Sequence, residues 1–209
     1  MVDLSHPVFT GWALIASGIA WLLQLVFVTL LYIVGGPFGA LSDFSNALSV
    51  LLLLPFALTL HKINQTNAAA SSWVVLLIGL VGIAAVAVPS ILILVGRINF
   101  QQSLPPIIAG FAGIGVWLLV SFWILKAHSS LPPNFIRWGL VIGLGLASTG
   151  LLLTVSGSNP LVGGDLKAFL SNPLLYPAFV LVPFGVLSYP FWAVWFGRLL
   201  AQRVIQLTG

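Results

Sequence analysis

The sequence predicts an all-α integral membrane protein, a bundle of six transmembrane helices forming a single polytopic domain over residues 1–209. Three observations predict it. The chain is 60% hydrophobic and only 5% charged, whereas soluble domains carry about 25% charged residues. It contains long apolar runs close to the roughly 20 residues that a helix needs to cross a bilayer. Glycine, proline and polar residues separate these runs, as expected of connecting turns.

The first helix is expected over residues 7–34, because Ser5 is a suitable N-cap and Gly35-Gly36-Pro37 ends the apolar run. Its apolar core is longer than the 7–15 residues of a secretory signal, so we expect a retained span. Polar residues 61–71 and residues 96–104 are expected to be loops. The four helices that follow are expected over residues 43–60, 72–95, 105–126 and 134–155.

The sixth helix is expected over residues 173–198 and contains Pro173, Pro177, Pro183 and Pro190. The last two prolines each remove a backbone donor from the helix interior. We therefore expect a kinked sixth helix that is buried by the others and lines any cavity. The alternative is that these prolines bend the helix without further purpose, since proline is common in transmembrane helices. The residues at helical spacing that form its aromatic face are Tyr189, Trp192 and Phe196.

Basic residues in short loops predict the orientation. One side of the membrane collects five of them, and the other side collects Arg97 and Lys167. The five are Lys62, Lys126, Arg137, Arg198 and Arg203. The first side is expected to be cytoplasmic, with both termini there. The composition fits a multi-pass protein of a bacterial plasma (inner) membrane.

A weak internal repeat predicts three copies of one helical hairpin. Odd-numbered helices open with a tryptophan and a later glycine, and even-numbered helices close with aromatic and basic residues. The tryptophans are Trp12, Trp73 and Trp138. The alternative is that this spacing reports bilayer thickness, because aromatic and basic residues collect at any membrane interface. The ending Pro-Phe-Trp…Phe-Gly-Arg resembles that of short aromatic-rich bacterial membrane proteins of unknown role.

Groups that carry catalysis are missing from the middle of every expected span, where no Asp, Glu, Lys, Arg or His occurs. This pattern argues against an enzyme, a proton relay and a voltage sensor. No cofactor is expected, and the scattered basic residues form no nucleic-acid-binding patch. His6, His61 and His128 lie at helix ends without the spacing of metal ligands, so interfacial histidines are favoured over a metal site.

The candidate ligand-binding residues combine the few polar groups of the spans with the sixth helix. Asp43 is expected either to cap the second helix or to pair with Arg97 at the mouth of a cavity covered by the loop 156–172. The full set is Gln24, Asp43, Asn46, Arg97, Tyr176, Ser188, Tyr189 and Trp192. Gly139 and Gly143 predict close helix packing, with a homodimer seam as the alternative.

Two functions follow from these observations. The favoured one is a non-catalytic membrane protein that binds an apolar ligand or lipid, or serves as an accessory subunit of a membrane assembly. Its partners are then the lipid bilayer and either another membrane protein or a second copy of the chain. The alternative is a transporter or channel for a neutral or weakly polar solute, motivated by the proline-rich sixth helix and the charges expected on the outer face.

Overall fold

A computed structural model describes residues 6–128, 132–150 and 176–202, and the regular structure in these ranges is helical. Five helices or helix pairs are long and apolar enough to cross a membrane. The elements are α1 (Pro7–Val34), α2 (Phe38–Leu51), α3 (Leu54–Asn67), α4 (Ala69–Leu94), α5 (Phe100–His128), α6 (Pro133–Ala147), the 3₁₀ turn η1 (Ser148–Gly150) and α9 (Tyr176–Ala201).

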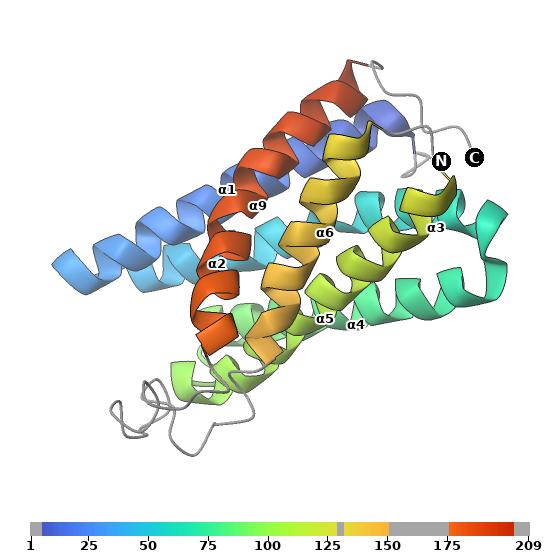
Figure 1. The fold of residues 1–209 in the computed structure, drawn as a ribbon. Coiled ribbons are helices and arrows are strands. Elements are labelled where there is room, and N and C mark those ends of the chain that lie inside the picture. The colour runs from blue at the N-terminus through green and yellow to red at the C-terminus, as the bar shows by residue number, and fades with distance from the viewer. Residues whose placement is uncertain (1–5, 129–131, 151–175, 203–209) are drawn as a thin grey trace.

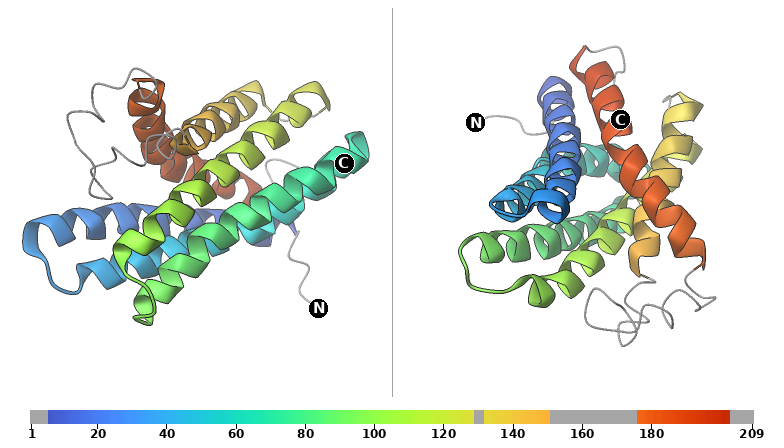
Figure 2. Two further views of the ribbon diagram at one scale, coloured as in Figure 1. Left: turned by 90° about the horizontal axis from the view of Figure 1, so that it is seen from below. Right: turned by 90° about the vertical axis from the view of Figure 1, so that its left-hand side faces the viewer.

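The helices close into a ring, as the views in Figures 1 and 2 show. Contacts run from α1 to α2, from α2 and α3 to α4, then through α5 and α6 to α9, which returns to α1. The second span consists of α2 and α3. Because α3 also contacts α1 and α5, this span lies inside the ring. The N-terminal end of α1 and the C-terminal end of α9 lie at the same end of the bundle (Figure 1).

The first predicted helix has the observed bounds, but the second differs in both position and form. It begins at Phe38, so Asp43 lies inside α2 and is not an N-cap. The predicted loop 61–71 is wrong, because α3 continues to Asn67 and α4 begins at Ala69. Polar side chains in this stretch extend the helix beyond the apolar run instead of ending it.

The predicted loop 96–104 is also shorter in the structure, because α5 begins at Phe100. The Asn99 backbone N–H donates to Gln102 Oε1 over 3.0 Å, and the Gln102 N–H donates to Asn99 Oδ1 over 2.9 Å. This is a capping box, in which two side chains satisfy two free backbone donors of a helix N-terminus.

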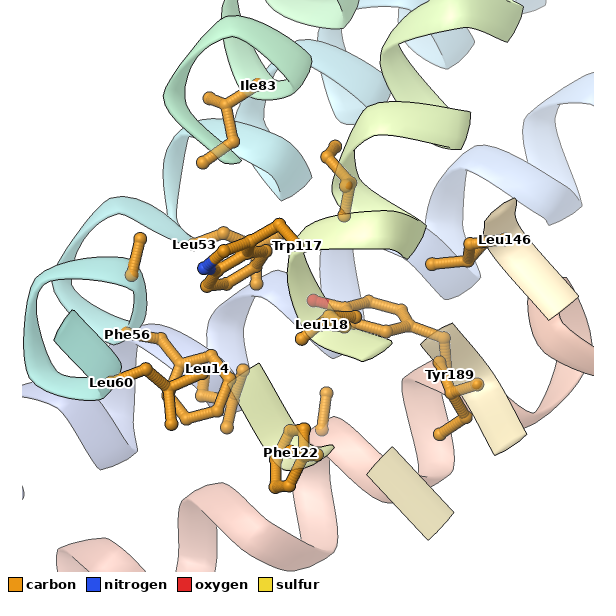
Figure 3. Packing of buried hydrophobic residues seen from close by; sticks show 14 of the residues in the cluster. Leu14, Leu53, Phe56, Leu60, Ile83, Trp117, Leu118, Phe122, Leu146 and Tyr189 are labelled. Carbon is orange, nitrogen blue, oxygen red and sulfur yellow. The ribbon is translucent and has the colours of Figure 1, made fainter. Parts of the chain in front are cut away.

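The core is rich in aromatic rings that meet edge to face. Phe56 of α3 lies 6.0 Å from the Trp117 ring and 5.9 Å from the Trp192 ring, measured between centroids. Phe122 and Phe196 complete the cluster, and Figure 3 shows Phe56, Trp117 and Phe122 in it. Large rings in such T-shaped pairs contribute both buried area and specific geometry, so they hold α3, α5 and α9 around a common centre.

Glycines allow the close approach of neighbouring helices. A Cβ atom at Gly82 of α4 would lie 2.8 Å from the Ile114 nitrogen of α5, and one at Gly145 of α6 would lie 2.6 Å from the Gly185 Cα of α9. Gly143 meets the Leu119 backbone in the same way. The predicted close packing at Gly139 and Gly143 is therefore confirmed, within one chain.

Tryptophans divide sharply between the core and one end of the bundle. Three are buried: Trp21, Trp117 and Trp192. The other five are exposed near the end that carries the start of α1: Trp12, Trp73, Trp123, Trp138 and Trp195. Lys62, Lys126, Arg137 and Arg198 lie near the same end. Such a girdle is typical of a membrane–water interface.

The last helix is less buried than its prolines predict. In α9, 39% of the apolar window is buried, whereas the value for the second span, Phe38–Thr66, is 67%. The second span is thus the most enclosed of the five, and the sixth expected helix is enclosed by the others along one face. One face of α9 packs inward and the opposite face is exposed.

Candidate functional site

The second span is interrupted between α2 and α3, at Leu52 and Leu53. The Leu53 N–H donates to the Val50 carbonyl over 3.1 Å, a tighter turn than the α-helix. Pro55, which follows, has no N–H to offer the Leu51 carbonyl. The Ser49 and Leu51 carbonyls therefore lack their usual helical donors within a membrane span. In lipid, each unpaired backbone group costs several kcal/mol.

Side chains from α1 and α9 meet at this interruption. The Ser17 hydroxyl donates to the Ser49 carbonyl over 2.7 Å, which occupies the acceptor left free by the tight turn. Ser17 Oγ also lies 2.6 Å from the Tyr189 hydroxyl. Figure 3 shows the Tyr189 ring extending from α9 into the buried cluster. Three spans are thus joined by hydrogen bonds inside the bundle.

Asn46 extends this polar group toward α4. Its Nδ2 donates to Ser90 Oγ over 3.0 Å, and the Ser90 hydroxyl donates to the Val86 carbonyl over 2.9 Å. Asn46 Oδ1 is buried and has no partner. An amide flip would place Nδ2 at the empty position and Oδ1 against Ser90 Oγ, whose hydroxyl already donates to the Val86 carbonyl.

The indole N–H of Trp21, which has no hydrogen-bond partner, lies at a depth in the bundle similar to that of Asn46. Trp21 is one helical turn beyond Ser17 on α1, and Asn46 is nearly one turn before Ser49 on the antiparallel α2. Both therefore lie on the same side of the bond between Ser17 and Ser49. Trp21 Nε1 is buried without a partner, and its ring lies 4.7 Å from the Tyr189 ring.

A hollow of about 400 Å³ lies between α6 and α9. Four aromatic side chains and one hydroxyl line it: Trp138, Ser188, Phe191, Trp192 and Trp195. Trp192 is 3% exposed, and its indole N–H has no hydrogen-bond partner. This aromatic hollow therefore offers a large apolar wall and the Ser188 hydroxyl, while the Trp192 N–H is buried behind that wall.

A second hollow, of about 370 Å³, lies between α4 and α5. Small and aliphatic residues line this aliphatic hollow: Val74, Leu77, Ile78, Val81, Gly82, Ala85, Ala109 and Gly113. None of these side chains carries a hydrogen-bonding group.

The structure brings together only part of the predicted set. Ser188 and Trp192 line the aromatic hollow, while Tyr189 and Asn46 belong to the polar group at the interrupted span. Gln24 is partly buried on α1 and takes part in neither. The side chain of Tyr176 lies outside the described residues.

Asp43 and Arg97 do not form the predicted pair. Arg97 is exposed, Asp43 is partly buried, and no ion pair joins them among the described residues. Arg97 follows the C-terminal end of α4, whereas Asp43 lies on α2. The segment 156–172, expected to cover this mouth, lies outside the described residues.

In the part of the chain that the structure describes, His61 forms a hydrogen bond between two neighbouring helices. His61 Nδ1 lies 2.7 Å from Ser72 Oγ, which joins α3 to α4 across their short turn. Within the described ranges no three His, Cys, Asp or Glu side chains come together to bind a metal. The position of His61 is explained by helix packing.

Several residues of both sites were missed from the sequence. Ser17, Ser49 and Ser90 are ordinary helix serines, and only their register identifies them. Pro55 was the visible signal for an interrupted span, because proline removes a donor from a helix. Trp138 was noted only as a repeat marker.

Comparison of the chain with protein-family models, with curated proteins and with solved structures gives no match. The two hollows and the interrupted span are therefore the features that indicate a function.

Proposed function

We propose that this chain is a non-catalytic, six-span protein of the plasma membrane that binds an apolar ligand or lipid in the aromatic hollow. The carrying observation is a hollow of about 400 Å³ that is lined by four aromatic side chains and the Ser188 hydroxyl. Ligand sites are mostly apolar concavities with a few placed polar groups.

The span that brings the total to six in this proposal is the fifth expected helix, formed by α6 with the residues that follow it. The described part, Pro133–Ala147, is 15 residues long, and the remaining apolar residues to 155 would complete a span. The basic end of the bundle would face the cytoplasm, as the excess of lysine and arginine favours. Accessory-subunit function is compatible with the same fold.

Native mass spectrometry from mild detergent tests the proposal. The wild-type protein should retain an extra mass of a few hundred daltons. Ser188→Phe should abolish retention, because the larger ring occupies the aromatic hollow. Ala85→Phe is the matched control, since it fills the aliphatic hollow and should leave retention unchanged.

Two outcomes would contradict the proposal. A bare wild-type monomer would show that no ligand is retained, and equal retention by Ser188→Phe would place the ligand elsewhere. An added mass of tens of kilodaltons in place of a small ligand would favour an accessory subunit.

The second candidate function is transport of a small neutral solute, favoured by the interrupted second span. Transporters place binding sites at interrupted helices near the bilayer midplane. Here an unpaired Trp21 donor and an unpaired Asn46 amide atom lie at a similar depth beside the interruption. Together they offer one donor and one acceptor to an uncharged molecule.

Uptake into proteoliposomes tests transport, with urea and glycerol as the probes. Asn46→Leu should abolish uptake, while Ser90→Ala, which keeps the Asn46 side chain, should preserve it. Uptake no faster than in empty vesicles would refute the transport hypothesis.

A further inference from the structure

Arg198 lies one helical turn beyond the rim of the aromatic hollow. Phe191, Trp195 and Arg198 are spaced i, i+4 and i+7, so they share one face of α9. Arg198 is exposed, whereas Phe191 and Trp195 line the hollow. At 1.5 Å per residue, Trp192 is about 9 Å and Ser188 about 15 Å farther along the helix axis from the basic end.

A second cation stands beside the same hollow on α6. Arg137 precedes Trp138, which lines the hollow, and is exposed. Neither Arg137 nor Arg198 forms an ion pair within the described parts of the chain. Both lie near the end with exposed tryptophans, where lipid headgroups are expected.

The groups follow one another along the membrane normal in a definite order. The two arginines come first, and the aromatic wall follows and reaches down to Ser188. A phospholipid presents the complementary order: an anionic phosphate and then an acyl chain. Arginine is well suited to phosphate, because its planar fork donates two parallel hydrogen bonds.

We propose that the aromatic hollow binds a phospholipid, with its phosphate at Arg198 and Arg137 and one acyl chain against the aromatic wall. This inference rests on the proposed ligand-binding function and names the ligand class. Inorganic phosphate alone leaves the apolar wall uncovered, and a hydrocarbon leaves the arginines unused.

The test compares two lipids with the same chains, palmitoyl-oleoyl phosphatidylglycerol and the diacylglycerol that lacks the phosphate. Native mass spectrometry of lipid titrations gives both affinities. Wild-type protein should bind the phosphatidylglycerol at least about tenfold more tightly, as a charge-assisted arginine–phosphate contact implies. Arg198→Gln should remove about tenfold of that affinity and leave diacylglycerol binding unchanged.

Lys126→Gln is the matched control, because Lys126 lies near the same end but over the Trp123 ring of α5, 5.3 Å from its centroid. It should change neither affinity. If Arg198→Gln fails to fold, salt provides the second test on wild-type protein. Raising it from about 0.1 to about 1 M shortens the Debye length from about 10 to about 3 Å, which should weaken phosphatidylglycerol binding alone.

Equal affinity for the two lipids, or equal effects of Arg198→Gln and Lys126→Gln, would overturn the phospholipid inference. The proposed function would survive that result if Ser188→Phe still abolished binding of both lipids. If Ser188→Phe left both affinities unchanged, the hollow itself would be excluded and the proposed function would fail with it.

Discussion

The aromatic hollow and the aliphatic hollow have similar volumes, about 400 and 370 Å³, but different chemistry. Glycines bring the helices together beneath both, Gly145 against Gly185 in one and Gly82 against Gly110 and Gly113 in the other. Only the aromatic hollow adds a hydroxyl and a wall of four aromatic side chains. Small residues at a helix contact explain a concavity between two helices, but they do not explain this aromatic wall.

The largest effect is expected from breaking the helix contact beneath the aliphatic hollow. In Gly82→Leu the new Cβ would lie 2.8 Å from the Ile114 nitrogen and 2.9 Å from the Gly110 oxygen. Overpacking of this kind costs about 3 kcal/mol, which lowers the melting temperature by roughly 6–12 °C. Thermal unfolding in detergent measures it.

The control for that prediction is Ala85→Leu, at the rim of the same hollow. It should change the melting temperature little, since partly exposed sites usually tolerate substitution within about 0.5 kcal/mol. Equal effects of the two substitutions would show that Gly82 is not required for the contact.

Trp192→Phe should sharpen the comparison by shrinking one ring of the aromatic wall. In protein stripped of lipid, the smaller ring leaves a cavity that lowers stability, and removing the unpaired buried donor offsets part of that loss. With ligand bound, the same substitution should weaken affinity. Chemical unfolding and lipid titration give the two values.

Trp117→Phe is the matched control for Trp192→Phe, because Trp117 is also buried in the aromatic core but does not line the hollow. It should leave ligand affinity unchanged. A loss of affinity equal to that of Trp192→Phe would assign the effect to core packing.

Tyr189→Phe tests the hydrogen bond that joins α9 to α1. Residues of α9 form one wall of the aromatic hollow. The substitution removes the hydrogen bond between the Tyr189 hydroxyl and Ser17 and should lower stability by about 1 kcal/mol. Ser17→Ala should cost more, because it also removes the bond to the Ser49 carbonyl. Adding Tyr189→Phe to Ser17→Ala should then change the melting temperature little, and full additivity would show that the two residues act separately.

The smallest effect is expected when a hydroxyl is added to the aliphatic hollow. Ala85→Ser gives that hollow a polar group comparable to Ser188, yet it provides neither an aromatic wall nor a buried indole N–H. Ligand retention should stay at the wild-type level, as native mass spectrometry would record. A new retained mass would show that any hydroxyl in a hollow is sufficient.

Residues 7–34 illustrate what the sequence predicts well, because a long apolar run with clear turn residues leaves one solution. The inward face of Tyr189, Trp192 and Phe196 was likewise predictable from helical spacing, and all three are buried. The interruption at Leu52 and Leu53 was missed because the apolar run continues through it. Hydropathy depends only on amino-acid composition, so it does not show which backbone carbonyls lose their hydrogen-bond donors.

The candidate site was harder to predict, because it depends on which helices are neighbours. The pairing of Ser17 with Tyr189 joins residues 172 positions apart, and no local pattern encodes it. Trp138 and Ser188 meet at one hollow only because α6 contacts α9. Asp43 and Arg97 were grouped by the side of the membrane they share, which is a weaker condition than contact.

The contact between α1 and α9 has a consequence for how the protein is made. A membrane protein is inserted from its N-terminus as synthesis proceeds, so α1 enters the bilayer well before α9 exists. Until then Gly11 and Gly18, which lie against α9 in the finished ring, have no final partner, although Ser17 and Ser49 are already in the membrane. If synthesis ends before α9 is made, the ring of helices should therefore stay open. Quality-control proteases would then recognise the uncovered face of α1.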